Sequence, residues 1–166
     1  VVWAEGGWVV GGDAGEPIDF AIWTTTPWTL PANRAVVLSA DLDYVLLDVG
    51  GRRVLVADAL AEDCAQRFGA ESHEIIGRAK GAALKGLLVV PPFGEAPVPI
   101  VLGEHVTTEA GTGCVHTAPA HGLEDFDMGQ RYGLEVYNPV GGNGVYHPDT
   151  PVFARQHIFK VNDDIV

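Results

Sequence analysis

Residues 23–33 read Trp-Thr-Thr-Thr-Pro-Trp-Thr-Leu-Pro-Ala-Asn, a segment with two prolines and three consecutive threonines. Pro27 and Pro31 each remove a backbone donor and bias the preceding residue away from helix, which predicts an extended, irregular passage. The three consecutive threonines, residues 24–26, place hydroxyl groups on both sides of that passage. Such a rigid segment can present hydroxyls to a small polar ligand, although an edge strand rich in β-forming residues has the same composition.

Short strands are expected on both sides of this stretch. Within residues 18–25, Ile18, Phe20 and Ile22 occupy every second position, which is the period of a strand. Gly50-Gly51 separates two β-rich runs and supplies the positive φ angles that a tight hairpin turn needs. The other expected strands are residues 35–39, 44–49, 53–57, 74–76, 87–90, 99–102 and 113–117.

Helices are expected at two places. The first runs from Asp58, which can cap it, to Phe68, and Gly69 ends it. The second covers residues 123–132 and stops at Gly133. Many short strands with few helices predict a mainly β fold, namely a closed or nearly closed β-barrel with peripheral α/β decorations.

The composition is that of a globular domain. The 166 residues, 47% of them hydrophobic and 19% charged, can bury one core, so residues 1–166 are interpreted as a single domain. The first residue is not methionine, and we expect the domain to be an insertion excised from a larger protein. No apolar stretch approaches the ~20 residues that span a bilayer, and the start lacks the basic region of a secretory signal.

Charge and cysteine content restrict the partners and the location. A formal net charge of −12 argues against tight nucleic-acid binding by the isolated chain, because phosphate contacts need clustered Lys and Arg. Any such contact is expected to be limited to a terminus that another part of the parent protein delivers. Cys64 and Cys114 lie far apart on different expected elements, so two reduced, buried thiols are expected, as in cytoplasmic proteins.

A second segment combines a glycine-rich turn, a strand, a proline-containing loop and the start of a helix. Residues 111–126 read Gly-Thr-Gly-Cys-Val-His-Thr-Ala-Pro-Ala-His-Gly-Leu-Glu-Asp-Phe. Loops held between rigid elements commonly carry functional sites, and His116, His121 and Asp125 can converge on one pocket. Taken singly, a satisfied core histidine and a surface carboxylate in a first helical turn explain His116 and Asp125 equally well.

Together the two segments resemble the editing (CP1) insertion of class I aminoacyl-tRNA synthetases for branched aliphatic amino acids. The sequence at residues 24–31 is similar to that of isoleucyl-tRNA synthetases, whereas the valyl and leucyl enzymes carry an Arg-Pro-Glu or Arg-Pro-Asp type sequence after two threonines. Residues 132–141 also resemble this family. The His-x-Gly-His and Lys-Met-Ser-Lys-Ser motifs of the family's ATP site do not occur in the chain, so no aminoacylation is expected from it.

The resemblance implies hydrolytic proofreading. The substrates would be valyl-adenylate and the 3′-terminal adenosine of tRNA(Ile) that wrongly bears valine. One methylene in an apolar pocket is worth only about 1–3 kcal/mol, and the choice between isoleucine and valine in this family is itself the standard illustration of that limit. A second, smaller site is therefore needed. The resemblance further implies no cofactor, no metal, no membrane contact, a cytoplasmic location and a monomer attached to the rest of the parent synthetase.

Roles for individual residues follow from the same resemblance. Asp125 would bind the α-ammonium group of the amino acid, and His116 would line the side-chain pocket. Water is the expected nucleophile, because no Ser-His-Asp or Cys-His arrangement is evident. The hydroxyls that would contact the adenosine or the ester and position this water belong to Thr24, Thr25 and Thr26, which with Asp125 form the catalytic set. The other substrate-binding candidates are Trp23 and Trp28, which can stack on adenine, together with His121 and Asn33.

Three other interpretations stay open at this point. The same domain could belong to a valyl or leucyl enzyme. A metal-dependent hydrolase could use His116, His121 and Asp125, although they lack the i, i+4 helical spacing of common zinc hydrolases and Pro119 interrupts them. A non-catalytic barrel could dock tRNA, which the acidic balance disfavours.

Overall fold

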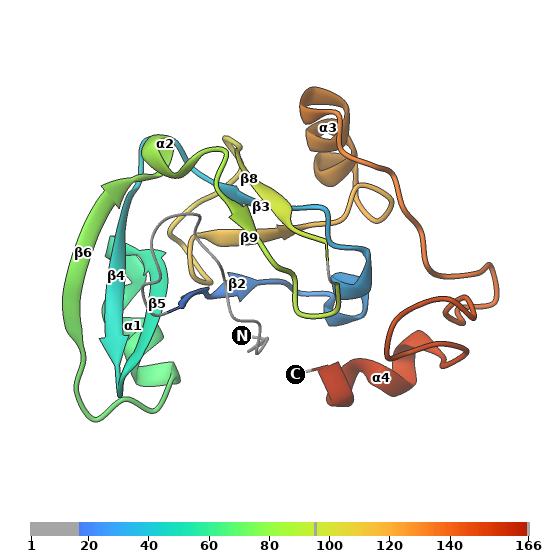
Figure 1. The fold of residues 1–166 in the computed structure, drawn as a ribbon, viewed down its shortest axis with the longest axis horizontal. Helices are drawn as coiled ribbons and strands as arrows, with labels where there is room; N and C mark the ends of the chain where they lie inside the picture. Colours follow the sequence, from blue (N-terminus) through green and yellow to red (C-terminus); the bar gives the residue numbers. More distant parts are fainter. Residues whose placement is uncertain (1–16, 95, 166) are drawn as a thin grey trace.

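The computed structural model describes residues 17–94 and 96–165, and its strands form two sheets (Figure 1). One sheet has the order β1-β5-β4-β6 and the other has the order β2-β9-β3-β8-β7. The strands are β1 (Ile18–Phe20), β2 (Ile22–Trp23), β3 (Ala35–Leu38), β4 (Asp43–Val49), β5 (Arg52–Ala57), β6 (Glu74–Lys80), β7 (Leu88–Val89), β8 (Val98–Leu102) and β9 (Cys114–Thr117). The helices are α1 (Ala61–Arg67), α2 (Gly81–Leu84), α3 (Leu123–Tyr132) and α4 (Ile158–Ile165), with two 3₁₀ segments, η1 (Pro27–Ala32) and η2 (Asp58–Leu60).

The expectation of a closed or nearly closed barrel is wrong, although the mainly β character with few helices is confirmed. Among the strands of the described chain, β1 and β6 are the edges of one sheet, and β2 and β7 are the edges of the other. Closing a sheet requires its two edge strands to pair along a shared length. β1 has 3 residues, and β2 and β7 have 2 each, so these edges offer too few backbone groups for closure.

The expected strand over residues 18–25 is divided between the two sheets. Ile18–Phe20 pairs in parallel with β5, whereas Ile22–Trp23 pairs in parallel with β9. Ala21 lies between them, buried, and donates its N–H to the carbonyl of Leu55 at 3.3 Å. The chain therefore crosses from one sheet to the other at a single small residue, and β2 carries the threonines to the second sheet.

The hairpin and the second helix are confirmed. Gly50 and Gly51 have φ angles of +61° and +87° and join the antiparallel strands β4 and β5. These left-handed angles are the ones that glycine adopts without strain. α3 has the expected bounds, and it ends at Gly133, whose φ of +64° is also left-handed. Local sequence patterns thus predicted the hairpin turn and the second helix correctly.

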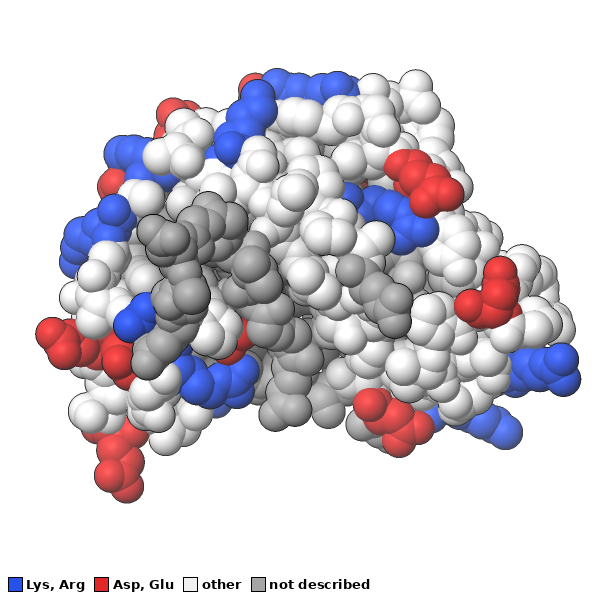
Figure 2. Space-filling view, in the orientation of Figure 1, with Lys and Arg blue, Asp and Glu red and all other residues white. Residues whose placement is uncertain are grey.

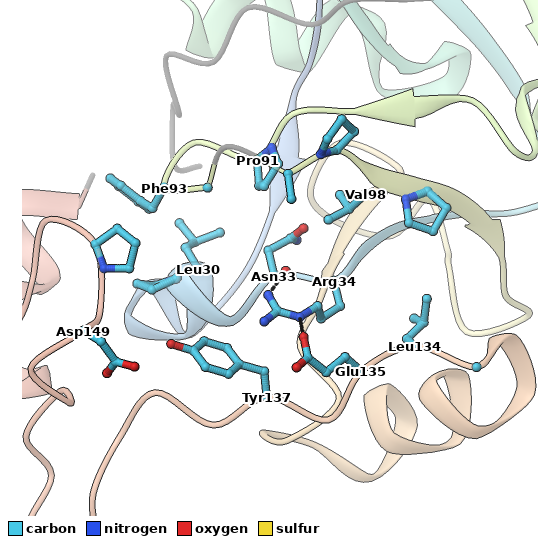
Figure 3. A pocket seen from close by; sticks show the side chains of 17 residues that line it. Leu30, Asn33, Arg34, Pro91, Phe93, Val98, Leu134, Glu135, Tyr137 and Asp149 are labelled. Atoms are coloured by element: carbon cyan, nitrogen blue, oxygen red, sulfur yellow. Dashed lines mark hydrogen bonds and ion pairs between the residues drawn. The ribbon is translucent and has the colours of Figure 1, made fainter.

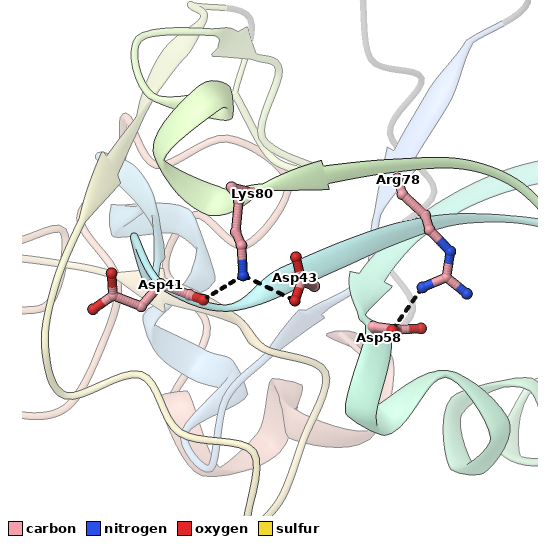
Figure 4. Close-up of polar contacts among 5 residues, drawn as sticks. All are labelled: Asp41, Asp43, Asp58, Arg78 and Lys80. Atoms are coloured by element: carbon pink, nitrogen blue, oxygen red, sulfur yellow. Dashed lines mark hydrogen bonds and ion pairs between the residues drawn. The ribbon is translucent and has the colours of Figure 1, made fainter.

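The expected cap of the first helix is wrong. Asp58 lies one turn earlier, in η2, and α1 begins after Leu60 with no side-chain cap. The Asp58 carboxylate instead pairs with Arg78 of β6 at 2.6 Å (Figure 4). On the same strand Lys80 contacts the carboxylate of Asp43 at 2.9 Å (Figure 4). These ion pairs flank β6, the exposed edge strand of the first sheet, and charges of this kind disfavour edge-to-edge association.

A single core joins the sheets, because buried side chains from both belong to one cluster. Tyr44 of β4 has no exposed surface; its hydroxyl donates to the Gly113 carbonyl at 2.7 Å and accepts the Ser39 N–H at 3.0 Å. Burial raises the pKa of Tyr44 above the usual range of a phenol. Gly113 has a φ of +80°, and a Cβ there would lie 2.5 Å from the Cβ of Ala57. Glycine at this position therefore allows β9 to start in contact with the first sheet.

The charge and cysteine observations also have structural counterparts. Figure 2 shows Lys and Arg side chains spread over the visible face, several of them beside Asp and Glu, rather than gathered in one patch. Cys64 and Cys114 are free and buried, as expected, and burial raises the pKa of Cys64 to about 11. Within residues 17–94 and 96–165, no helix has both the length and the apolar character needed to cross a membrane.

Candidate functional site

A pocket of about 470 Å³ lies where the segment after β2 faces the loop between β9 and α3. β2 and β9 are parallel neighbours, with Ile22 opposite Cys114 and Trp23 opposite Val115. The residues that follow these two strands therefore emerge at the same edge of the sheet. The lining residues are Trp23, Thr24, Thr25, Thr26, Thr29, Val115, His116, His121, Gly122, Leu123, Glu124 and Asp125. The two segments that the sequence singled out thus meet at one pocket.

Two of the expected site residues lie outside the lining. Trp28 packs against His121, with ring centroids 5.2 Å apart and the planes nearly perpendicular. Asn33 contacts His116, with its Nδ2 2.6 Å from Nδ1 of the imidazole. Each of these residues therefore supports a lining histidine and does not itself form the wall. Trp23 is the tryptophan that lines the pocket.

His116 is buried, and both of its ring nitrogens contact protein groups. Nε2 lies 3.0 Å from Oγ1 of Thr29, and Nδ1 lies 2.6 Å from Nδ2 of Asn33. Burial, together with a smaller contribution from the neighbouring His121, lowers the pKa of His116 from 6.5 to about 3. The ring is therefore neutral near pH 7 and forms an uncharged part of the pocket wall.

The threonine hydroxyls are connected to this histidine. Thr24 Oγ1 accepts the N–H of Thr26 at 3.1 Å, which folds the threonine segment on itself. The passage that follows is the 3₁₀ helix η1 rather than extended chain, because Pro27 occupies its first turn, where no N–H donor is needed. In a 3₁₀ helix residues three apart lie over one another, so Thr29 returns to Thr26 and donates to its carbonyl at 2.8 Å.

Asp125 lies half-buried in the first turn of α3, at the pocket. Its Oδ2 accepts the N–H of Ala118 at 2.9 Å, which orients the carboxylate before any ligand arrives. Burial raises the pKa of Asp125, while the bond from Ala118 and the charge of His105 oppose this change. The pocket therefore combines a fixed carboxylate, an uncharged imidazole and several hydroxyls.

This donor set does not resemble a metal centre. Both ring nitrogens of His116 already contact protein groups, so the imidazole has no nitrogen to offer an ion. In the part of the chain that the structure describes, no three His, Cys, Asp or Glu side chains are placed to hold a metal together. The alternative of a metal-dependent hydrolase that uses His116, His121 and Asp125 gains no support from this geometry.

The sequence interpretation missed Thr29 as a site residue. It is 3% exposed, lines the pocket and contacts His116. The available signal was its position three residues after Thr26 within a proline-bounded segment, which matches a 3₁₀ turn. Leu123, 85% exposed at the pocket rim, and Glu124 were also missed, because nothing local distinguishes them from surface residues of a first helical turn.

A larger pocket, of about 560 Å³, surrounds Arg34 (Figure 3). The guanidinium is already engaged, since Nε contacts Glu135 at 3.0 Å and the group lies 4.4 Å from the centre of the Tyr137 ring. Of the expected site residues, only Asn33 lines this pocket. The smaller pocket, which is lined by all the other expected residues except Trp28, is therefore the candidate site.

Comparison with known proteins agrees with this geometry. The family model described as leucyl-tRNA synthetase, editing domain, matches residues 13–152. An isoleucine–tRNA ligase of Shewanella amazonensis is 60% identical over 154 residues, which are 90% of this chain and 16% of that protein. An isoleucine–tRNA ligase of Shewanella sp. (strain MR-7) is 57% identical over 158 residues, which are 93% of this chain and 17% of that protein. The chain thus spans less than a fifth of these curated relatives.

Solved structures show the same fold at low identity. The crystal structure of GlLeuRS-CP1 aligns with a TM-score of 0.73 and 14% identity, over 89% of this chain and 78% of that one. The cytosolic leucyl-tRNA synthetase editing domain of P. falciparum aligns with a TM-score of 0.61 and 13% identity, over 70% of this chain and 48% of that one. At this identity the likeness concerns the arrangement of the backbone.

Proposed function

Because this chain belongs to the family of synthetase editing domains, we propose that it hydrolyses the ester between valine and tRNA(Ile) as the proofreading part of an isoleucine–tRNA ligase. The family model is described by a leucyl enzyme, and its match over residues 13–152 identifies the type of domain rather than the amino acid that it handles. The identities of 60% and 57% to isoleucine–tRNA ligases favour that parent over a valyl or leucyl enzyme. The 18–33 and 111–126 segments, which carry the resemblance, both lie within the matched range of 13–152.

The observation that carries the proposal is the meeting of the threonine segment and the histidine/aspartate loop at one pocket. An aminoacyl ester presents three features, namely an α-ammonium group, a small apolar side chain and a carbonyl that water attacks. The carboxylate of Asp125 matches the ammonium group through a charge-assisted hydrogen bond. The neutral ring of His116 matches the side chain, and the hydroxyls of Thr24, Thr25 and Thr26 match the ester and its water.

The reaction needs little more than orientation. An ester is already reactive, so holding it and a water molecule at a fixed angle supplies much of the rate. Oδ2 of Asp125 is fixed by Ala118, which gives the ammonium group a defined position. The carbonyl carbon then lies a fixed distance from the threonine hydroxyls, where water is held for attack.

Selectivity follows from the size of the side-chain space. Valine enters, whereas isoleucine brings one more methylene toward the ring of His116, which Thr29 and Asn33 hold on two sides. Small extra groups in a packed site force shifts of the surrounding side chains. A steric clash of this kind disfavours isoleucine by more than the transfer free energy of one methylene group.

The test measures hydrolysis of valyl-, isoleucyl- and threonyl-tRNA by this chain. We expect the valyl ester to be cleaved at least about tenfold faster than the isoleucyl ester. Shrinking the wall with His116→Ala is expected to raise isoleucyl relative to valyl cleavage. Equal cleavage of the valyl and isoleucyl esters by the unchanged chain, or cleavage of threonyl-tRNA alone, would overturn the assignment.

Several finer features belong to the same proposal. Valyl-adenylate is a second substrate, and the tRNA contact is limited to the 3′-terminal adenosine, beside which Trp23 can lie as a stacking wall. The rest of the parent enzyme delivers that end, in keeping with the net charge of −12. The chain acts as a monomer, without a cofactor, in the cytoplasm.

A further inference from the structure

The orientation of the Asn33 side chain is determined by a backbone carbonyl. Nδ2 of Asn33 lies 3.1 Å from the carbonyl oxygen of Ala35, which can only accept a hydrogen bond. The atom that faces it must therefore be the amide nitrogen. The same nitrogen lies 2.6 Å from Nδ1 of His116. Both Asn33 and His116 are buried, at 3% and 5% exposed, so water does not compete for these bonds.

This orientation determines where the imidazole carries its proton. An amide nitrogen donates, so Nδ1 of His116 must accept and carries no hydrogen. In a neutral ring the hydrogen is then on Nε2, which donates to Oγ1 of Thr29 at 3.0 Å. The Thr29 hydroxyl donates its own hydrogen to the carbonyl of Thr26 at 2.8 Å, so its oxygen can accept the hydrogen of Nε2. Every bond in the series has one donor and one acceptor.

The opposite tautomer would break two bonds at once. With a hydrogen on Nδ1, two donors would face each other, namely the Nδ1–H of His116 and the amide N–H of Asn33. Nε2 would then have to accept from Thr29, whose hydrogen already lies toward the carbonyl of Thr26. The series is therefore consistent in one direction, which runs from Asn33 through His116 to Thr29.

We propose that Asn33 is a positioning residue that selects the Nε2–H tautomer of His116 and so fixes the ring as the wall that separates valine from isoleucine. This inference rests on the proposed function and deepens it. Asn33 does not touch the substrate; it acts through His116. Because both ring nitrogens are occupied by Asn33 and Thr29, the ring cannot rotate away from a longer side chain without giving up a buried hydrogen bond.

A consequence reaches the threonine segment. Oγ1 of Thr26 lies 3.4 Å from Oγ1 of Thr29, whose hydrogen is already used. Thr26 is therefore the donor in that contact, and Oγ1 of Thr24, which lies 3.4 Å from Oγ1 of Thr26, is in turn the donor to Thr26. The hydrogen-bond directions that start at Asn33 are thus consistent through Thr29 as far as the threonine segment.

The first test reads the tautomer directly by nitrogen-15 NMR of the histidine rings in the unchanged chain. We expect a protonated Nε2 and an unprotonated Nδ1 for His116 between pH 5 and 8. A hydrogen on Nδ1 over this range would overturn the proposal. This measurement needs no variant and no hydrolysis, so it stands even if the chain cleaves no ester.

The second test changes the partner of Nδ1. In Asn33→Asp a carboxylate replaces the donor, so we expect Nδ1 of His116 to become protonated at neutral pH. The other titratable groups of the pocket, His121, Glu124 and Asp125, are unchanged by this substitution. Asn138→Asp, at an exposed position whose side-chain oxygen accepts the Val140 N–H, adds the same charge and is expected to leave the His116 signals unchanged. Unchanged His116 signals in folded Asn33→Asp would contradict the proposal.

The third test measures selectivity in Asn33→Leu, which keeps the shape of the side chain and removes its hydrogen bonds. We expect isoleucyl relative to valyl cleavage to rise about tenfold, since a freed ring no longer excludes the methylene. An equal loss on both esters would assign Asn33 a general structural role. A chain that cleaves neither ester before substitution would instead reject the proposed function and leave the tautomer result intact.

Discussion

At the scale of single residues, the site depends on titratable groups whose pKa values are shifted by burial. Burial lowers the pKa of His116 to about 3, and burial raises the pKa of Asp125. Each of these groups is also anchored, His116 by Thr29 and Asn33, and Asp125 by the N–H of Ala118. The pocket is therefore organised before a substrate enters it, which lowers the entropy cost of orienting the ester.

The lowered pKa of His116 predicts a loss of stability in acid. Between pH 6.5 and about 3 the unfolded chain binds a proton on this residue and the folded chain does not. The free energy of unfolding therefore falls as pH falls through that window, with a slope that approaches about 1.4 kcal/mol per pH unit from this group. Denaturant unfolding of the chain and of His116→Gln at several pH values measures the difference. Parallel pH profiles would show that His116 titrates normally in the folded chain.

Removal of the Asp125 charge predicts a large loss of hydrolysis with little effect on folding. Asp125→Asn can still accept the Ala118 N–H, but it loses the charge-assisted bond to the substrate ammonium, worth about 1.5–3 kcal/mol. We expect kcat/KM on valyl-tRNA to fall about 10- to 100-fold. Asp127→Asn, at an exposed position of the same helix outside the pocket lining, is the control and should change the rate less than about threefold. Equal effects of the two variants would remove Asp125 from substrate binding.

At the scale of elements, the site depends on how β9 meets the first sheet. Gly113 precedes β9 at a φ of +80°, and its carbonyl accepts the buried Tyr44 hydroxyl at 2.7 Å. The strand that carries His116 is thus placed by a residue that has no side chain. β2 pairs in parallel with this strand, so the segments that follow β2 and β9 emerge at one edge of the sheet.

Gly113→Ala is predicted to destabilise the fold. The left-handed backbone alone costs roughly 1–2 kcal/mol for a residue with a Cβ, and that Cβ would lie 2.5 Å from Ala57. We expect a loss of at least about 2 kcal/mol in denaturant unfolding. Gly142→Ala, where nothing lies within 4 Å of the added atom, should change stability by less than about 0.5 kcal/mol. Similar values for both variants would mean that the sheets do not meet closely at Gly113.

Elements defined by neighbouring residues could be predicted from the sequence, and those defined by distant pairing could not. The Gly50-Gly51 turn and α3 with its Gly133 end follow from local backbone preferences. The division of residues 18–25 between two sheets depends on pairing with β5 and β9, which alternation within one segment does not encode. The barrel expectation failed for the same reason, since strand order sets closure.

The candidate site could be predicted to a similar extent. Unusual residue patterns identified His116, Asp125 and the threonines, all of which line the pocket. Asn33 was assigned to the substrate, whereas it stands behind His116, and this difference depends on side-chain packing between segments. Thr29 became visible as a site residue once η1 was known to be a 3₁₀ helix.

At the scale of the whole molecule, two open sheets share one core, and the candidate pocket lies at the edge where β2 and β9 end. The net charge of −12 and the basic side chains scattered over the face in Figure 2 match the proposed contact with a single terminal adenosine rather than with a long RNA segment. The chain is 16% to 17% of the length of its curated relatives, so the remainder of such an enzyme is available to hold the tRNA.

The most direct measurement is a crystal structure of this chain with a non-hydrolysable amide of valyl-adenosine, paired with a binding titration of the isoleucyl amide. We expect the valyl amide to occupy the pocket of about 470 Å³, with its ammonium group at Asp125 and its side chain against His116. We expect the isoleucyl amide to bind at least about tenfold more weakly. A valyl amide in the pocket around Arg34, or equal affinity for the two amides, would contradict the proposed function.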